Sequence, residues 1–149
     1  YWHSPSTSGN LAGVTPPDHI TVAAADGRVD QWAIEHSTLG RDHRLVLRSP
    51  TNDQWTSQAR DVFECLMGLR EQVEPLGLRL CCNGARRDAW ASGMQRDMGS
   101  GFTTYLLGDT PKGQRPPAVA TLDTAPIELV VTADEQRSWY RAWLGVPPT

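Results

Sequence analysis

Hydrophobic residues alternate with polar ones along the first third of the chain, which is the period of a strand with one buried face. The alternation recurs in three runs, at residues 20–24, 31–35 and 44–48. Two turn sequences separate the runs, Asp26-Gly27 and Gly40-Arg41-Asp42, and Asp-Gly is typical of tight hairpins. This pattern predicts an antiparallel meander of three strands.

The period changes after residues 50–53, Pro-Thr-Asn-Asp, and a helix is expected from there to about Glu74. Pro75 and Gly77 end this helix, and residues 78–82 alternate again as a short strand. One apolar face of the helix recurs at steps of three and four residues: Val62, Phe63, Leu66, Leu69, Val73 and Leu76.

Shorter elements follow. We expect a helix over residues 85–99, with a possible restart at Ser92 as N-cap, and a strand over 102–107. A Gly/Pro-rich loop covers 108–117, and a last strand covers 127–131.

The final helix is predicted by a capping box, because the Thr132 hydroxyl and the Glu135 carboxylate can each satisfy a backbone donor of the first turn. Gly145 and Pro147 end it. The helix carries an aromatic stripe that we expect to bury Trp143 against the sheet: Trp139, Tyr140, Trp143 and Leu144.

The element order β-β-β-α-β-α-β-β-α predicts an α+β fold, with a mainly antiparallel sheet of about six strands and about three helices. Residues 1–17 are rich in Ser, Thr, Pro and Gly and indicate an extended N-terminal arm. Residues 18–149 are expected to form a single domain, because the chain has the usual length of one domain.

Composition narrows the function classes. The net charge is −3, with 14 basic and 17 acidic residues, which argues against nucleic-acid binding through a basic surface. No apolar run reaches the roughly 20 residues that span a bilayer, so we expect no membrane partner. Cys65, Cys81 and Cys82 are odd in number and lack a C-x-x-C pair, so no metal, no cofactor and no disulfide is expected. Reduced thiols are typical of a cytoplasmic protein.

The densest cluster of chemistry-bearing residues runs from Cys81 to Gly101. It resembles a motif of a family of small uncharacterised bacterial proteins, C-N-G-A-R-x-D followed by S-G-M-x-R-x-M-G-x-G and an aromatic residue. The family has no established activity, so the resemblance implies no mechanism. The matching positions are Cys82 to Arg86, Asp88, Ser92 to Met94, Arg96, Met98, Gly99, Gly101 and Tyr105.

Two interpretations of this segment remain open. In the first, a glycine turn and a helix start combine with three guanidinium groups to bind an anion, and the chain must bend at Ser92-Gly93 for Arg86 and Arg96 to converge. The candidate ligand residues are Asn83, Arg86, Arg87, Asp88, Ser92, Arg96 and Tyr105. In the second, the arginines pair with nearby aspartates or stay solvated, and Trp90, Met94 and Met98 form a core-facing helix stripe.

The sequence does not contain a complete set of catalytic residues that can be recognised from spacing alone. Cys81 lies on the strand face opposite Leu80 and Cys82 and is expected to be accessible, with His19, His36 and His43 as candidate bases. The sequence leaves open whether the chain is an enzyme. Six tryptophans are many for this length, and exposed aromatic residues near arginines are typical of binding surfaces, so Trp55 and Trp90 are candidate partner-binding residues.

The leading hypothesis is a small intracellular bacterial binding protein that acts through a protein partner, for example an immunity or regulatory protein of a competition or defence system. The alternative is an enzyme or ligand-binding domain that holds an anionic small molecule at Asn83–Gly101. A closed pocket lined by the three arginines and Tyr105 would favour the ligand. A flat exposed patch containing Trp90 or Trp55 would favour the partner.

Overall fold

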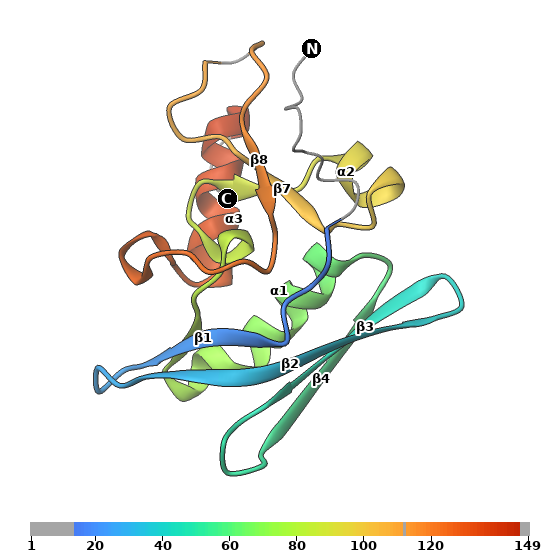
Figure 1. Ribbon diagram of the computed structural model, residues 1–149. Helices are drawn as coiled ribbons and strands as arrows, with labels where there is room; N and C mark the ends of the chain where they lie inside the picture. Colours follow the sequence, from blue (N-terminus) through green and yellow to red (C-terminus); the bar gives the residue numbers. More distant parts are fainter. Residues whose placement is uncertain (1–13, 112, 147–149) are drawn as a thin grey trace.

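The computed structural model describes residues 14–111 and 113–146. Most of the predicted arm, residues 1–17, therefore lies outside the described residues. The fold is α+β with antiparallel sheets, as the sequence predicts. A curled five-stranded sheet carries the helix α1, and a smaller three-stranded sheet lies beside the helices α2 and α3 (Figure 1).

The five-stranded sheet confirms the predicted meander and extends it. Its strands pair in the order β4-β3-β2-β1-β5, and every pairing is antiparallel. The fifth strand returns beside the first after α1 and takes up the first residues of the predicted strand 78–82. The strands are β1 His19–Ala24, β2 Val29–Leu39, β3 Asp42–Arg48, β4 Gln54–Ala59 and β5 Leu78–Leu80.

The expected helix start after Asp53 is wrong, because β4 comes first and pairs with β3 along its whole length. Alternation in this strand is weak, since only Trp55 and Ala59 are apolar. Gly68 of α1 makes the close approach of helix and strand possible, because a Cβ at that position would clash with Ser57 Oγ. Tertiary packing thus decides an element that local pattern does not reveal.

Helix α1, Val62–Val73, begins at Asp61, whose carboxylate accepts a hydrogen bond of 2.8 Å from the Glu64 amide. A short 3-10 helix, η2 Glu74–Leu76, follows, and Gly77 at φ +83° ends it. The apolar face of α1 packs on the sheet and forms the core with these buried residues: Ile20, Val22, Ile34, Leu45, Leu47, Leu66, Leu69, Val73 and Leu80.

The predicted helix over 85–99 is wrong in its first half. Residues 83–85 form a 3-10 turn, η3 Asn83–Ala85, and Ala89–Trp90 form the strand β6, which pairs with Leu106 and Tyr105. Only Gly93–Met98 is helical, as α2, and Ser92 is its N-cap in a capping box with Gln95, as predicted for the restart. Pairing with β7 and a turn hydrogen bond from the Ala89 amide to the Arg86 carbonyl replace the helical pattern there.

Strands β7, Thr103–Leu106, and β8, Ala118–Ala120, complete the small sheet in the order β6-β7-β8. The prediction for 102–107 is thus confirmed, whereas β8 was not predicted. Residues 127–131 are not a strand: Ile127–Leu129 form the 3-10 helix η4 after Pro126. Ile127 and Leu129 are exposed, so their alternation reflects no buried strand face.

Helix α3, Ala133–Leu144, has the predicted capping box of Thr132 with Glu135 and ends at Gly145. It buries Ala133 and Gln136, whereas Trp139, Tyr140 and Trp143 are only half-buried. The expectation of a buried Trp143 is therefore wrong, because α3 turns its polar Gln136 toward the interior.

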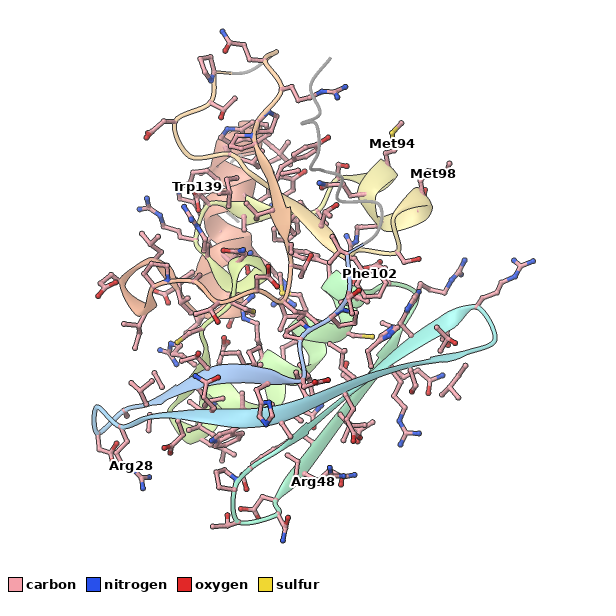
Figure 2. The ribbon with its side chains drawn as sticks, viewed as in Figure 1. Arg28, Arg48, Met94, Met98, Phe102 and Trp139 are labelled. Atoms are coloured by element: carbon pink, nitrogen blue, oxygen red, sulfur yellow. The ribbon has the colours of Figure 1, made fainter. Side chains whose placement is uncertain are left out.

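Two methionines of α2 project away from the molecule in Figure 2, Met94 at 75% and Met98 at 83% exposure. The predicted core-facing stripe of Trp90, Met94 and Met98 is thus wrong, because Trp90 lies on a strand and not on the same helix. Within the described residues, no helix has the length and apolar character needed to cross a membrane.

Candidate functional site

The segment Cys81–Gly101 connects the two sheets, and its motif residues are held by packing and backbone contacts. Asn83 donates from Nδ2 to the Ala120 carbonyl at 3.0 Å. A Cβ at Gly84 would lie 2.7 Å from Leu66 Cδ2 and from Thr121 Cγ2. Gly101 adopts φ +75°, and a Cβ there would lie 2.7 Å from the Phe63 nitrogen. Much of the motif therefore has a structural role at the junction of the sheets.

The chain bends before Ser92-Gly93, but the three arginines of the predicted anion site have separate partners. Arg86 forms two hydrogen bonds to Asp88, at 3.1 and 3.3 Å. The Arg87 guanidinium lies over the ring of Trp139, with 5.9 Å between its Cζ atom and the ring centroid. Arg96 pairs with carboxylates of α1 and its N-cap. The guanidinium groups are thus each engaged with a different part of the molecule.

Arg96 is fixed at the start of α1. Its Nε atom is 3.2 Å from Asp61 Oδ2, and its Nη2 atom bonds to the Glu64 carboxylate. Its Cζ atom also lies 5.3 Å from the centroid of the Phe63 ring. These contacts hold α2 against α1. Arg96 also lines a groove that is described below.

The remaining predicted site residues lie in different parts of the structure. Ser92 serves as the N-cap of α2, and Asp88 is the partner of Arg86. Trp55 stacks on Trp32 within the large sheet, with 5.4 Å between the ring centroids. Trp90 lines two adjoining hollows, and Tyr105 lines one of them.

The first hollow, here called the aromatic groove, has a volume of about 360 Å³ and lies between α1, α2 and α3. Trp90 stacks on Tyr140 with 4.3 Å between the ring centroids and 9° between the ring planes, and it meets Phe63 edge to face at 5.2 Å. The groove is lined by Phe63, Glu64, Met67, Trp90, Arg96, Arg137, Tyr140, Arg141, Leu144 and Val146.

The second hollow, here called the side hollow, shares Trp90 and Tyr140 with the groove and has a volume of about 180 Å³. Trp143 continues the stack, with its ring centroid 6.1 Å from that of Tyr140. The Trp90–Tyr140 pair is therefore a wall between two adjoining hollows. The side hollow is lined by Trp90, Ser92, Tyr105, Leu107, Thr110, Gly113, Gln114, Pro116, Tyr140 and Trp143.

The charges of the groove are mostly neutralised within the protein. Arg96 is held by two carboxylates, and Arg137 pairs with Glu71 and with Asp134. Arg141 also lines the groove, is exposed, and forms no ion pair within the part of the chain that the structure describes. A single guanidinium at the rim is thus left to meet an external anion.

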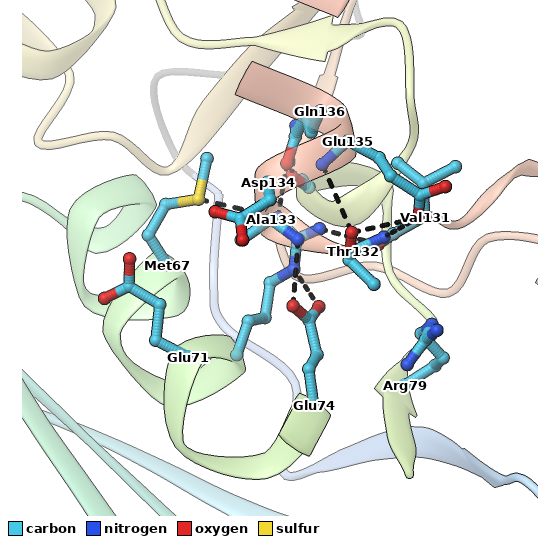
Figure 3. A network of polar contacts seen from close by, with 12 residues as sticks. Met67, Glu71, Glu74, Arg79, Val131, Thr132, Ala133, Asp134, Glu135 and Gln136 are labelled. Atoms are coloured by element: carbon cyan, nitrogen blue, oxygen red, sulfur yellow. Dashed lines mark hydrogen bonds and ion pairs between the residues drawn. The ribbon is translucent and has the colours of Figure 1, made fainter. Parts of the chain in front are cut away.

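A buried polar network fixes α3 relative to α1 and so sets the walls of the groove (Figure 3). Arg70 has no exposed surface and donates to Glu74 at 3.1 Å, to the Val131 carbonyl at 2.8 Å and to Gln136 Oε1. The Glu74 carboxylate also accepts a hydrogen bond of 2.8 Å from the Ala133 amide at the start of α3.

Gln136 continues the network toward the central segment. Its amide nitrogen donates to the Gly84 carbonyl at 2.9 Å and to the Ala89 carbonyl at 2.7 Å. One side chain therefore joins α3 to the turn at residues 83–85 and to the strand that carries Trp90. Burial lowers the pKa of the Arg70 guanidinium, and the Glu74 charge opposes that shift.

Most of the residues that line the groove were not predicted from the sequence. Phe63 is buried, as predicted for the apolar face of α1, and it also lines the groove, whereas Met67, Arg137 and Arg141 were not predicted as site residues. A signal was present, because Phe63 and Met67 are four residues apart on α1. On α3 the spacing also places one set on a single face: Arg137, Tyr140, Arg141 and Leu144. Nothing in the sequence indicates that these two faces meet.

The thiols are poorly placed for nucleophilic chemistry. Cys81 is 1% exposed, so its predicted accessibility is wrong, and burial raises the pKa of its thiol. Burial also raises the pKa of Cys65 to about 11 and that of Cys82 to about 12. All three are free cysteines, as predicted. Within the described residues, no thiol hydrogen-bonds an imidazole; the Cys65 thiol donates to the backbone carbonyl of His43.

Two of the candidate bases pair with each other. His36 Nε2 lies 2.9 Å from His43 Nδ1, and Phe102 meets both rings edge to face. Desolvation and the neighbouring His43 lower the pKa of His36. His19 lies on β1 and is exposed. The described residues contain no cluster of three or more His, Cys, Asp or Glu side chains that could hold a metal ion.

Comparison of the chain with models of known protein families and with curated proteins finds no match. The chemistry of the aromatic groove is therefore the basis for a functional proposal.

Proposed function

We propose that this protein is a binding domain that docks onto a protein partner through the aromatic groove. The observation that carries the proposal is the composition of the groove. Seven of its ten lining residues are of the types enriched at the centres of protein interfaces, although two of the seven, Phe63 and Met67, are themselves buried. The seven are Phe63, Met67, Trp90, Arg96, Arg137, Tyr140 and Arg141.

The state of these side chains also supports binding. Trp90 and Tyr140 are half-buried and stack on each other, so they offer an apolar surface whose two rings already contact each other before a partner binds. Arg96 and Arg137 are fixed by ion pairs, so little side-chain entropy is lost when a partner covers them. An immunity or regulatory protein of a bacterial competition or defence system would act in this way, by covering a surface of its partner. We place it in the cytoplasm, where buried thiols stay reduced.

The second candidate is a ligand-binding domain or enzyme that holds an anionic small molecule, and the concave shape of the groove favours it. The charges restrict the ligand, because two of the three arginines already face two carboxylates each. Arg141 alone offers one bidentate pair of donors, which fits a single carboxylate or phosphate group.

The proposal is tested by affinity capture from the native host, followed by measurement of the affinity of the purified partner. Trp90→Ala removes the central ring, and Arg141→Glu reverses the charge of an exposed side chain without touching the core. Each should weaken binding about tenfold or more. Trp55→Ala and Arg41→Glu are the matched controls outside the groove, and they should leave the affinity unchanged.

Circular dichroism of each variant checks that the fold is intact. If Trp90→Ala and Arg141→Glu both bind the partner as tightly as the original protein, docking through the groove is refuted. A rise in melting temperature in millimolar phosphate or acetate, lost in Arg141→Glu, would favour the small-anion candidate.

A further inference from the structure

The aromatic rings around the two hollows carry polar atoms that have no partner. Trp90 Nε1, Tyr105 Oη and Tyr140 Oη make no hydrogen bond within the described residues, and none of these atoms is fully buried. An indole N–H and a phenol O–H usually have a hydrogen-bond partner once they are covered. A partner that covers these rings must therefore bring hydrogen-bond acceptors with it.

Different peptide conformations meet this requirement to different degrees. A helix uses most of its carbonyl groups in its own hydrogen bonds, so it presents few acceptors along its side. An added β-strand needs a row of free backbone groups on the receptor. The strand residues that line these hollows are Trp90, on the two-residue edge strand β6, and Tyr105, on the central strand β7, so no such row is offered. A polyproline II segment has no internal hydrogen bonds and leaves every carbonyl free.

Proline rings also match the apolar part of the hollows. The wall between them is the flat Trp90–Tyr140 stack, and Trp143 lies nearly parallel to Tyr140. Aromatic-lined grooves with N–H or O–H donors recognise proline-rich segments in this way. One extended segment can cross the wall and place an apolar side chain in each hollow.

The charge at the rim completes the description of the partner. Arg141 lines the aromatic groove, and neither an ion pair nor a hydrogen bond engages its guanidinium within residues 14–111 and 113–146. An acidic residue beside the proline-rich segment would pair with it without displacing any existing ion pair.

We propose that the aromatic groove and the side hollow together bind a proline-rich segment in the polyproline II conformation, with an acidic residue at the Arg141 end. This inference rests on the proposed function, because it names the chemistry of the partner that docks there. Tyr105 binds on the side-hollow side of the wall, and Arg141 binds on the groove side.

Synthetic peptides test the inference with the full chain. The main probe is a short peptide of Pro-Pro-Leu repeats with one Glu at one end, made in both orientations. One control peptide replaces every Pro by Ala, and another replaces the Glu by Gln. Binding is followed by NMR through the indole N–H signal of Trp90, which is assigned with Trp90→Phe.

We expect one orientation of the proline peptide to shift the Trp90 signal, and the Ala peptide to bind at least about tenfold more weakly. Tyr105→Phe keeps the ring and removes one donor, so it should weaken binding about three- to tenfold. Arg141→Gln should weaken binding of the Glu peptide and leave binding of the Gln peptide unchanged. Trp55→Phe, outside both hollows, is the matched control.

Equal binding of the proline and Ala peptides, or no shift with either orientation at millimolar concentration, would overturn the inference. The proposed function fails separately, when binding of the captured partner is insensitive to both Trp90→Ala and Arg141→Glu. A partner lost in Trp90→Ala together with silent proline peptides would refute the proline segment alone and leave the docking surface in place.

Discussion

Substitution of Arg70 tests how α1 and α3 are held together. It is fully buried and links Glu74 of η2, the Val131 carbonyl and Gln136 of α3. Arg70→Met keeps the apolar stem of the side chain, so it leaves no large cavity, but it removes the charge and all of its donors. The perturbation therefore isolates the polar part of the contact.

The expected loss follows from what remains behind. The Glu74 side chain is 9% exposed and would keep one hydrogen bond, from the Ala133 amide. Breaking one partner of a buried ion pair costs about 3–5 kcal/mol. The Val131 carbonyl and Gln136 Oε1 would also lose their donor, so we expect a loss of about 4 kcal/mol. That is a large part of the roughly 5–15 kcal/mol of stability of a typical domain.

Urea unfolding followed by circular dichroism measures this free energy, through a lower midpoint at an unchanged slope. In the double variant Arg70→Met/Glu74→Gln, the unpaired charge is removed, and the new side-chain amide still has an oxygen that can accept from the Ala133 amide. This variant should therefore recover about 1–2 kcal/mol relative to the single variant. Arg60→Met changes an exposed arginine just before α1 and should stay within about 0.5 kcal/mol. A loss below about 1 kcal/mol for Arg70→Met would refute the role assigned to this network.

Three further outcomes are expected. Free-thiol titration at pH 8 should find the folded protein almost unreactive, because Cys65, Cys81 and Cys82 are buried and their pKa values are raised. After unfolding without reductant, the titration should count three thiols, and a count of one would reveal a disulfide. Trp143→Ala should cost about 1–2 kcal/mol in urea unfolding, because the ring is half-buried, and a loss above about 3 kcal/mol would contradict that exposure. The lowered pKa of His36 means that the folded state favours the neutral ring, so its contribution is fully present above the unfolded value near 6.5 and is lost as the pH falls below it. Unfolding at pH 7.5 and 5.5 should show this loss and His36→Asn should reduce it; an equal loss in the variant would exclude His36 as the cause.

Local pattern was sufficient wherever an element is stabilised by its own residues. The three strands of the meander alternate because one face is buried, and α3 begins at a capping box formed by side chains three residues apart. Ser92 was predicted as an N-cap for the same reason. Such signals lie within a few residues of each other, so they can be read without knowing the fold.

The site depended on contacts that are distant in sequence. Residues 89–90 have helical spacing with α2, yet they pair with β7, and that pairing turns Trp90 toward Tyr140 of α3. The Arg70 network decides how α1 and α3 meet, and their junction creates the aromatic groove.

The sequence by itself determined the α+β class, the meander and the caps of α2 and α3, because short-range periodicity and capping chemistry specify them. The number and spacing of the cysteines were enough to predict free thiols. Only the tertiary structure decided the partners of Arg86, Arg87 and Arg96, the burial of Cys81 and the place of Trp90. A guanidinium selects its partner by position in space, and packing between distant segments sets that position.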